Sequence, residues 1–254
     1  MPPIPLLSVV LPAYNEQASI EKVVIDHWLV LQTLKGIATD WEIVVVDDAS
    51  RDDTFQILEA LQKRIPQLRV FRNTNNLGIF GAFARCYAEA RGTHIYSTGS
   101  DGQWPAENLV PMATRVVAGA DAVIGVRTNR REVYSLARRI VSFGFNALPK
   151  WLFGVDVQDA GGVKLGTRLI FESGLISTSP FVEAERIIRA HYSGLRIEFV
   201  PIRFLVRAGG KAKGASWRNI RSSLRDVVRC AATYGFRRKP GSLHPPSRDG
   251  VVRL

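Results

Sequence analysis

The sequence predicts an open α/β fold, in which a mostly parallel sheet is flanked by helices. Short β-branched runs alternate with stretches whose apolar residues recur at helical spacing, and polar clusters follow several of the runs. The chain has 254 residues, of which 46% are hydrophobic, so it is long enough to bury one large core. We therefore expect one principal domain with a C-terminal appendage.

The first half of the sequence alternates between strand and helix patterns. Residues 6–11 and 42–46 are β-branched runs, and helical spacing follows each of them, at 16–34 and 52–61. This order is typical of parallel strands joined by crossover helices. Further strands are predicted at 68–71, 95–98 and 122–125, and a further helix at 79–90.

Beyond residue 128 the pattern changes. It predicts an arginine-rich helix at 130–152, a glycine-rich loop at 159–166, a helix at 183–192, a strand at 196–204 and a basic loop at 207–214. From residue 216, apolar residues again recur at helical spacing with arginines around them, which predicts an amphipathic basic helix. Residues 239–254 lack periodicity and are expected to form a loose tail.

Three polar clusters fall at predicted strand ends, namely Tyr14 to Glu16, Asp47 with Asp48, and Ser100 with Asp101. In open α/β sheets, ligands bind outside the carboxyl ends of the strands. We therefore expect the three clusters to converge on one binding site.

The positive charge is concentrated in one segment. The net charge is +11, and residues 203–239 contain eleven Lys or Arg but a single acid, Asp226. Such a segment favours phosphates, an anionic membrane surface or nucleic acid. Because it carries no nucleic-acid-binding motif and no interleaved aromatic residues, we expect no nucleic-acid partner. The helix from 216 has two open interpretations: it lies in a membrane interface, or it packs on the protein core.

We expect no membrane-spanning helix, because the longest apolar runs break at Pro149, Lys150 and Asp156. The N-terminus lacks the basic region of a signal peptide, which predicts a cytoplasmic location. Cys86 and Cys230 lie far apart without metal-ligand spacing, and we assign them no chemistry.

Several short motifs follow one another in the first half of the chain. They are VVLPAYNE at 9–16, EIVVVDDAS at 42–50, DT at 53–54, NLG at 76–78, ARG at 90–92 and SDGQWP at 100–105. Together they resemble the family 2 glycosyltransferases over roughly residues 6–215. The resemblance implies a GT-A fold and inverting transfer from a nucleotide sugar. It divides the chain into a Rossmann-like nucleotide-sugar half at 1–128, an acceptor half at 129–215 and a basic C-terminal segment at 216–254.

A nucleotide sugar needs a flat slot for its base and a counter-charge for its diphosphate. Pro12, Ala13 and Tyr14 are predicted to wall the base, while Glu16 and Asp47 accept hydrogen bonds from base or ribose. Ser100 and Asp101 complete the predicted donor site.

The predicted metal site departs from the family pattern. The family has Asp-x-Asp where this sequence has Gly99-Ser100-Asp101, so only the second acid is present. Asp101 and the carbonyl oxygen of Gln103 are predicted to hold Mg²⁺ or Mn²⁺, more weakly than two acids would. The missing acid leaves open a non-catalytic, nucleotide-sugar-binding homologue.

The second half resembles the polyprenyl-phosphate branch of the family. The similar positions are 125–127, Arg130, Arg138, Ser142, Asn146, 153–154, the segment from Asp159 to Lys164, and the loop 207–214. The resemblance implies that Arg127, Arg207 and Lys213 contact the donor diphosphate or the acceptor phosphate. The predicted catalytic set is Asp101, Arg127, Asp159, Lys164 and Arg207.

The acceptor decides whether a general base is needed. A phosphate monoester is largely a dianion at neutral pH, because its second pKa is about 6, and it needs no base. A sugar or natural-product hydroxyl, which stays open as the alternative acceptor, would need Asp159, Glu183 or Glu185 as the base. The expected partners are a GDP- or UDP-hexose, a polyprenyl phosphate and the inner face of the cell membrane, where the protein would be peripheral. A separate membrane-anchoring protein is a further candidate partner.

Overall fold

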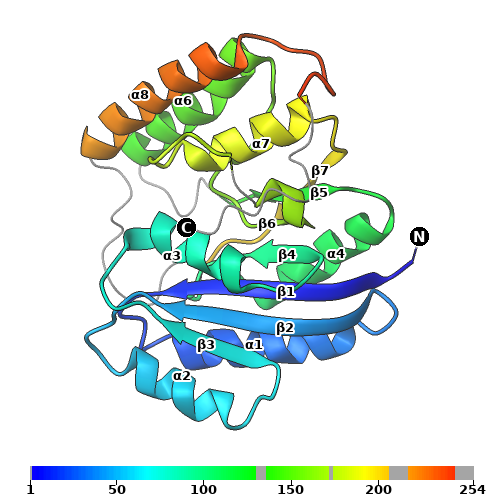
Figure 1. Ribbon diagram of the computed structural model, residues 1–254, viewed down its shortest axis with the longest axis vertical. Helices are drawn as coiled ribbons and strands as arrows, with labels where there is room; N and C mark the ends of the chain where they lie inside the picture. The colour runs from blue at the N-terminus through cyan, green and yellow to red at the C-terminus, as the bar shows by residue number, and fades with distance from the viewer. Residues whose placement is uncertain (1, 130–135, 172–173, 206–216, 244–254) are drawn as a thin grey trace.

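The computed structural model describes residues 2–129, 136–171, 174–205 and 217–243. One seven-stranded sheet in the order β3-β2-β1-β4-β6-β5-β7 forms the centre of the molecule (Figure 1). Its strands are β1 (Ile4–Ala13), β2 (Ala38–Asp47), β3 (Leu68–Arg72), β4 (His94–Ser97), β5 (Ala122–Arg127), β6 (Lys164–Thr167) and β7 (Ile197–Ile202).

The helices connect these strands and cover the sheet. They are α1 (Ile20–Thr33), α2 (Thr54–Gln62), α3 (Gly78–Glu89), α4 (Leu109–Val117), α6 (Leu136–Phe153), α7 (Val182–Tyr192) and α8 (Trp217–Tyr234), with short 3-10 turns at Ala106–Asn108 and Arg168–Ile170. The predicted open, mostly parallel α/β sheet is confirmed.

Parallel pairing joins β3, β2, β1 and β4, as well as β5 and β7. Strand β6 alone runs antiparallel to both of its neighbours, β4 and β5. The sequence predicted a loop over 159–166, so this prediction was wrong for the part that forms β6. A four-residue strand has no readable periodicity, and two neighbouring strands supply its hydrogen bonds. Helix α4 was also not predicted.

Both faces of the sheet are apolar, as expected for buried parallel strands. On β1, Val9 packs with the side chains of α1, α2 and α4, whereas Val10 packs with α3 on the other face. A second core lies between helices: Phe153 of α6, Ile187 of α7 and Val227 of α8 belong to one buried cluster. Figure 1 shows these three helices together on one side of the sheet.

Helix α8 packs on the protein core through one face only. Val227, Cys230 and Tyr234 are buried against the helical core, whereas Leu224 and Val228 are exposed. The core-packing interpretation is therefore correct for the inner face, and the outer face stays accessible. Of the predicted tail, Leu243 donates its N–H to the Tyr192 carbonyl at 2.9 Å, and residues 244–254 lie outside the described part. None of the described helices has the length and apolarity needed to cross a membrane.

Candidate active site

The carboxyl ends of β1 and β4 are joined by short polar side chains. Ser100 Oγ donates to the Pro12 carbonyl at 2.7 Å, and Ser19 Oγ donates to the Ser100 carbonyl at 2.9 Å. The same Ser19 hydroxyl lies 3.1 Å from Glu16 Oε2. The predicted donor-site residues at 12–16 and 100–101 therefore meet at one edge of the sheet.

The carboxyl end of β2 is tied to the same edge. The Asn15 N–H donates to Ser50 Oγ at 3.0 Å, and the Arg51 N–H donates to Asn15 Oδ1 at 2.9 Å. Asn15 and Ala49 both have positive φ, at 56° and 59°. A left-handed alanine is strained, and such strain collects at functional sites. The three predicted polar clusters thus converge.

The two adjacent acids after β2 point to different partners. The Asp47 side chain is fully buried, 3.2 Å from Arg72 Nε, and it also accepts from the Ser50 N–H at 3.3 Å. Asp48 accepts from Leu77 N–H and Gly78 N–H, each at 2.9 Å, at the start of α3. Asp48 therefore holds the Asn-Leu-Gly turn, which explains that motif structurally. The proposed contact of Asp47 with base or ribose stays a prediction.

The predicted base slot has a buried floor and a half-buried wall. Pro12 and Ala13 are buried at the end of β1, and Tyr14 and Glu16 are partly exposed in the loop that follows. Partial exposure suits side chains that meet a ligand, since a flat aromatic ring offers stacking surface. Their role in nucleotide binding stays a prediction.

Asp101 and Gln103 supply oxygen atoms at the predicted metal site. Asp101 is partly exposed, and its Oδ1 accepts from the Gln103 N–H at 3.2 Å. The Gln103 amide donates Nε2–H to the Leu205 carbonyl at 3.1 Å, which leaves its own carbonyl oxygen as a ligand atom. Among the described residues no group of three or more His, Cys, Asp or Glu is arranged to hold a metal. The donor set fits a hard divalent cation only if the substrate diphosphate supplies further oxygens.

An edge-to-face aromatic pair, Trp104 and Phe204, lies between Asp101 and Arg127. A Cβ placed on Gly99 would lie 3.5 Å from Asp101 Oδ1 and 3.4 Å from Trp104 Cδ1, so these two side chains border the same point. The Arg127 guanidinium carbon lies 5.4 Å from the Trp104 ring centroid and 5.3 Å from that of Phe204. Trp104 and Phe204 were not predicted as site residues, although Trp104 stands inside the SDGQWP motif.

Asp159 fixes the Arg127 guanidinium against the two rings. Arg127 Nε–H donates to Asp159 Oδ2 at 2.7 Å, and its terminal NH2 group pairs with Oδ1. The Arg127 backbone N–H also donates to Oδ2, at 3.1 Å. The carboxylate is fully buried and the arginine side chain is 9% exposed. Such a bidentate buried pair holds the arginine in a single orientation.

Lys164 lies beneath the Asp159 loop with all three ammonium hydrogens engaged. Its Nζ donates to the carbonyls of Ala160 and Gly162, at 2.8 and 3.0 Å, and to Glu183 Oε2 at 2.6 Å. Burial alone would raise the pKa of Glu183, but the charges of Lys164 and Arg186 lower it below its usual value. The lysine therefore supports the loop that carries Asp159, and its predicted catalytic role stays a prediction.

Glu185, the third acid considered as a general base, also has hydrogen-bond partners. Glu185 is fully buried and accepts from the N–H groups of Ile176 and Ser177, at 2.9 and 2.8 Å, and from the Tyr234 hydroxyl at 2.6 Å. Asn146 of α6 accepts from the Ala160 N–H at 3.1 Å and so supports the same loop as Lys164. The predicted phosphate contacts Arg207 and Lys213 lie outside the described residues, as does Arg130.

Comparison with known proteins agrees with this geometry. The sequence model described as glycosyl transferase family 2 matches residues 8–168. A dolichol-phosphate mannosyltransferase from Pyrococcus furiosus is 30% identical over 219 residues, which cover 82% of this chain and 58% of that protein. An undecaprenyl-phosphate 4-deoxy-4-formamido-L-arabinose transferase from Pseudomonas paraeruginosa is 29% identical over 242 residues, covering 92% and 68%.

Among solved structures, glucosyl-3-phosphoglycerate synthase from Mycobacterium tuberculosis, crystallised with Mn²⁺, UDP and glucosyl-3-phosphoglycerate, superposes with a TM-score of 0.62. The two chains are 20% identical, and the match covers 92% of this chain and 81% of the synthase. This likeness supports the fold. The chain spans little more than half the length of the Pyrococcus relative.

Proposed function

The chain belongs to glycosyl transferase family 2, and we propose that it transfers a hexose from a GDP- or UDP-sugar to the phosphate of a polyprenyl phosphate. The names of the Pyrococcus and Pseudomonas relatives support a lipid-phosphate acceptor, because both contain a polyprenyl phosphate. The reaction forms a bond between an acceptor phosphate oxygen and the anomeric carbon. The bond from that carbon to the donor diphosphate breaks, with inversion.

This proposal rests on one observation: each carboxylate considered as a general base already has a hydrogen-bonded or charged partner. A hydroxyl acceptor would need a carboxylate to take its proton. Asp159 is paired with Arg127, Glu183 with Lys164, and Glu185 with Tyr234. A phosphate acceptor is already a dianion at neutral pH, because its second pKa is about 6, and it attacks without a base. The observed partners therefore favour phosphate over hydroxyl.

The protein's work is then to position two anions and to stabilise the leaving group. Pro12, Ala13 and Tyr14 would wall the base, and Glu16, Asp47 and Ser100 would bind the nucleoside. Asp101 and Gln103 would hold Mg²⁺ or Mn²⁺, which supplies charge to the departing diphosphate when bound. The neighbour crystallised with Mn²⁺ and UDP supports divalent-metal use in this fold.

The cations have complementary tasks. Arg127, held flat by Asp159, would direct its charge to one phosphate, and Arg207 with Lys213 would offset the repulsion between donor and acceptor. Lys164 would keep the Asp159 loop in place from below. We further propose that the protein works as a peripheral protein on the cytoplasmic face of the membrane, where its concentrated positive charge meets anionic lipid.

Transfer of radiolabel into the organic phase tests this proposal. The assay offers GDP- and UDP-hexoses with a short polyprenyl phosphate, with and without Mg²⁺ or Mn²⁺. We expect label from one donor, and a loss of about 100-fold in Asp101→Asn, because the diphosphate loses its metal-holding acid. Asp53→Asn, at the exposed start of α2, serves as the matched control and should leave transfer unchanged.

Two results would contradict the proposal in different ways. Label found in a water-soluble glycoside but not in lipid would indicate a hydroxyl acceptor. Nucleotide-sugar binding by calorimetry without transfer to any acceptor would indicate a non-catalytic homologue, the reading that Gly99 in place of the first acid favours.

A further inference from the structure

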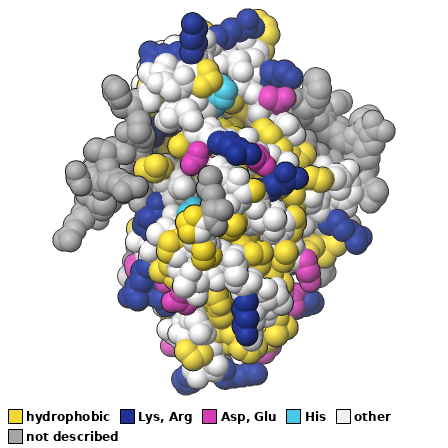
Figure 2. All heavy atoms as spheres, turned by 90° about the vertical axis from the view of Figure 1, so that its right-hand side faces the viewer, with side chains coloured by type: hydrophobic (Ala, Val, Ile, Leu, Met, Phe, Trp, Pro, Cys, Tyr) yellow, Lys and Arg dark blue, Asp and Glu magenta, His cyan; other side chains and the backbone are white. Residues whose placement is uncertain are grey.

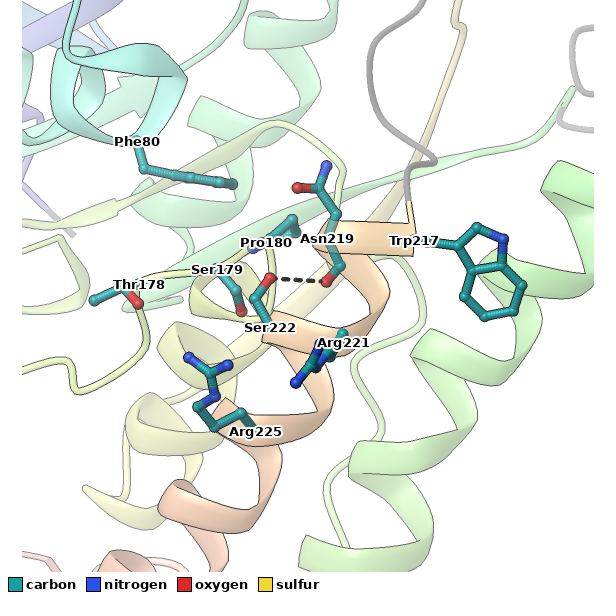
Figure 3. Close-up of a pocket in the computed structure, with 9 residues that line it drawn as sticks. All are labelled: Phe80, Thr178, Ser179, Pro180, Trp217, Asn219, Arg221, Ser222 and Arg225. Atoms are coloured by element: carbon teal, nitrogen blue, oxygen red, sulfur yellow. Dashed lines mark hydrogen bonds between the residues drawn. The ribbon is translucent and has the colours of Figure 1, made fainter.

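A cavity lies beside the N-terminal end of α8 (Figure 3). Neither Arg127 nor Asp159 is among the residues that line it. Its volume is about 810 Å³, and it lies between the first turns of α8, the loop 178–180 that leads into α7, and Phe80 of α3. This size is within the range of small-molecule sites. None of the residues that line it belongs to the predicted donor or catalytic set.

Two arginines with no acidic partner line this cavity. Arg221 and Arg225 are exposed, one helical turn apart, and no described carboxylate lies within ion-pair distance of either. The next arginine at helical spacing, Arg229, does have an acid, Asp226, at 3.4 Å. In Figure 3, Arg225 lies on the side of α8 that faces the loop of Thr178 and Ser179.

The acid of α8 cannot neutralise them because it is turned inward. Asp226 is 2% exposed, and its Oδ2 accepts from the N–H groups of Thr178 and Ser179, each at 2.9 Å. The carboxylate thereby fixes the loop against α8. The two unpaired cations leave the wall strongly positive, which fits a ligand with one or two negative charges.

An exposed apolar stripe runs along the same helix. Trp217 is 85% exposed, Leu224 55% and Val228 68%. Their spacing of seven and then four residues places them on one face of α8. Arg221 falls within this stripe and Arg225 beside it. Exposed Trp next to aliphatic residues and arginines is typical of helices that lie in a lipid interface.

Positive charge is also present on another face of the molecule. Figure 2 shows the face on the right of Figure 1, where Lys and Arg side chains are scattered and several lie beside Asp or Glu. Elsewhere on the described surface, arginines have acidic partners: Arg115 and Arg196 both pair with Glu198, at 3.6 and 2.6 Å. Positive charge alone therefore does not distinguish the α8 surface. The combination of unpaired cations, a cavity and an adjoining apolar stripe does.

We propose that this cavity binds the headgroup phosphate of an anionic phospholipid, with the acyl chains lying along the Trp217, Leu224 and Val228 stripe. Arg221 and Arg225 supply the counter-charge, and the Thr178 hydroxyl and the Asn219 amide line the same space. The proposed site uses none of the residues assigned to the acceptor phosphate. It rests on the proposed function only in placing the protein at a membrane.

Binding of a soluble short-chain lipid tests the cavity directly. Calorimetric titration uses dihexanoyl phosphatidylglycerol below its micellar concentration, with dihexanoyl phosphatidylcholine and inorganic phosphate as comparison ligands. We expect saturable binding of the glycerol lipid only, and about 30-fold weaker binding in Arg221→Gln/Arg225→Gln. Lys63→Gln/Arg64→Gln removes the same charge from exposed positions at the end of α2 and should bind like the original protein.

Several outcomes would overturn the inference. Equal binding of inorganic phosphate would assign the cavity to a free anion, and equal weakening in the α2 variant would reduce the effect to net charge. No saturable binding of phosphatidylglycerol would also refute it. These results are read by calorimetry and so do not depend on whether sugar transfer occurs.

A transfer assay separates this site from the acceptor site. In detergent with a short polyprenyl phosphate, Arg221→Gln/Arg225→Gln should transfer at the original rate, while flotation on phosphatidylglycerol vesicles is lost. Loss of transfer with donor binding intact would mean that the two arginines bind the acceptor, which contradicts a separate lipid site. Absence of transfer in the original protein would refute the proposed function and leave the lipid titration unaffected.

Discussion

The two halves of this molecule hold their polar groups in different ways. In the first half, up to β5, short side chains bind the backbone of nearby loops, as Ser100 does to Pro12 and Asp48 does to Leu77 and Gly78. Both halves also contain ion pairs, but the cation is buried most deeply in the second half: the Lys164 side chain, paired with Glu183, is 4% exposed, against 21% for Arg69 and 44% for Arg72 in the first half.

This difference has an energetic meaning. A capping carboxylate exchanges water for backbone N–H groups, and its loss costs the hydrogen bonds that it accepts. A buried ion pair has lost its hydration on both sides, so removal of one partner leaves an uncompensated charge. We therefore expect the second half to be the more sensitive to single substitutions that change charge.

The largest effect is expected at Lys164. Lys164→Met removes the nearer of the two cations beside Glu183 and the donor to two loop carbonyls, and it should lower the free energy of unfolding by about 3–5 kcal/mol in urea denaturation. Lys150→Met is the matched control, because its ammonium lies 3.3 Å from Asp156 on the surface. It should cost less than about 1 kcal/mol. Similar costs for the two lysines would show that burial of the ion pair does not raise its sensitivity, and the reason for expecting a more sensitive second half would be lost.

A smaller loss is expected at Asp48. Asp48→Ala leaves the Leu77 N–H without its acceptor and removes the nearer of the two acceptors of the Gly78 N–H, and it should cost about 2–3 kcal/mol of unfolding free energy. Asp53→Ala provides the comparison, since Asp53 stands at the N-cap of α2 but makes no capping hydrogen bond. Its effect should stay below about 0.5 kcal/mol. An equal loss of unfolding free energy at Asp48 and at Lys164 would show that the two kinds of interaction stabilise this protein equally.

The pH dependence of stability should reflect His27 of the first half. Burial lowers the pKa of His27; its Nδ1–H donates to the Val23 carbonyl at 2.8 Å, and its Nε2 has no partner. As the pH falls below about 6.5, His27 of the unfolded chain therefore binds a proton, whereas His27 of the folded protein is still neutral. The contribution of neutral His27 to the free energy of unfolding is fully present above that pH. It falls as the pH drops, by up to about 1.4 kcal/mol per pH unit, until the pKa of His27 in the folded protein is reached.

His27→Phe tests this assignment, because it removes the titrating ring and keeps an aromatic side chain. Urea denaturation between about pH 7.5 and 5 should show the slope in the original protein and a flatter line in the variant. The two lines would run parallel if another group caused the acid sensitivity.

The smallest effect is expected at the site that both halves share. Gly99→Asp places a second carboxylate next to Asp101, where an added Cβ meets its neighbours at ordinary contact distances of 3.4 to 3.6 Å. In the presence of the nucleoside diphosphate, Mn²⁺ affinity should rise about tenfold. Gly99→Asn has nearly the same shape without the charge and should leave the affinity unchanged. A rise in both variants would point to an effect other than the added acid.

The first half of the fold was well predicted from the sequence. The five strand positions between 6 and 125 and the helices at 20–33, 54–62 and 78–89 correspond to predicted segments. The convergence of the polar clusters at 14–16, 47–48 and 100–101 was also confirmed, since they follow parallel strands that end at one edge. Strand β6 was missed because its pairing with β4 and β5 is not encoded in its own four residues.

The candidate site was predicted in part. The motif residues stand where the family pattern places them, but their roles in binding and catalysis stay predictions. Phe204 could not be predicted, because only the return of β7 beside β5 brings it to Arg127. Trp104 carried a signal, its place beside the predicted acid, which the sequence interpretation did not use.

The sequence by itself determined the alternation of strand and helix, the position of the polar loops and the concentration of positive charge toward the C-terminus. Each of these is a local property, read from neighbouring residues or from composition. The tertiary structure alone decided which charges are paired and buried. Arg127 meets Asp159 across 32 positions and Tyr234 meets Glu185 across 49, and such partners are set by packing between distant elements. For the same reason only the fold shows that α8 keeps Asp226 inside and that no described carboxylate pairs with Arg221 or Arg225.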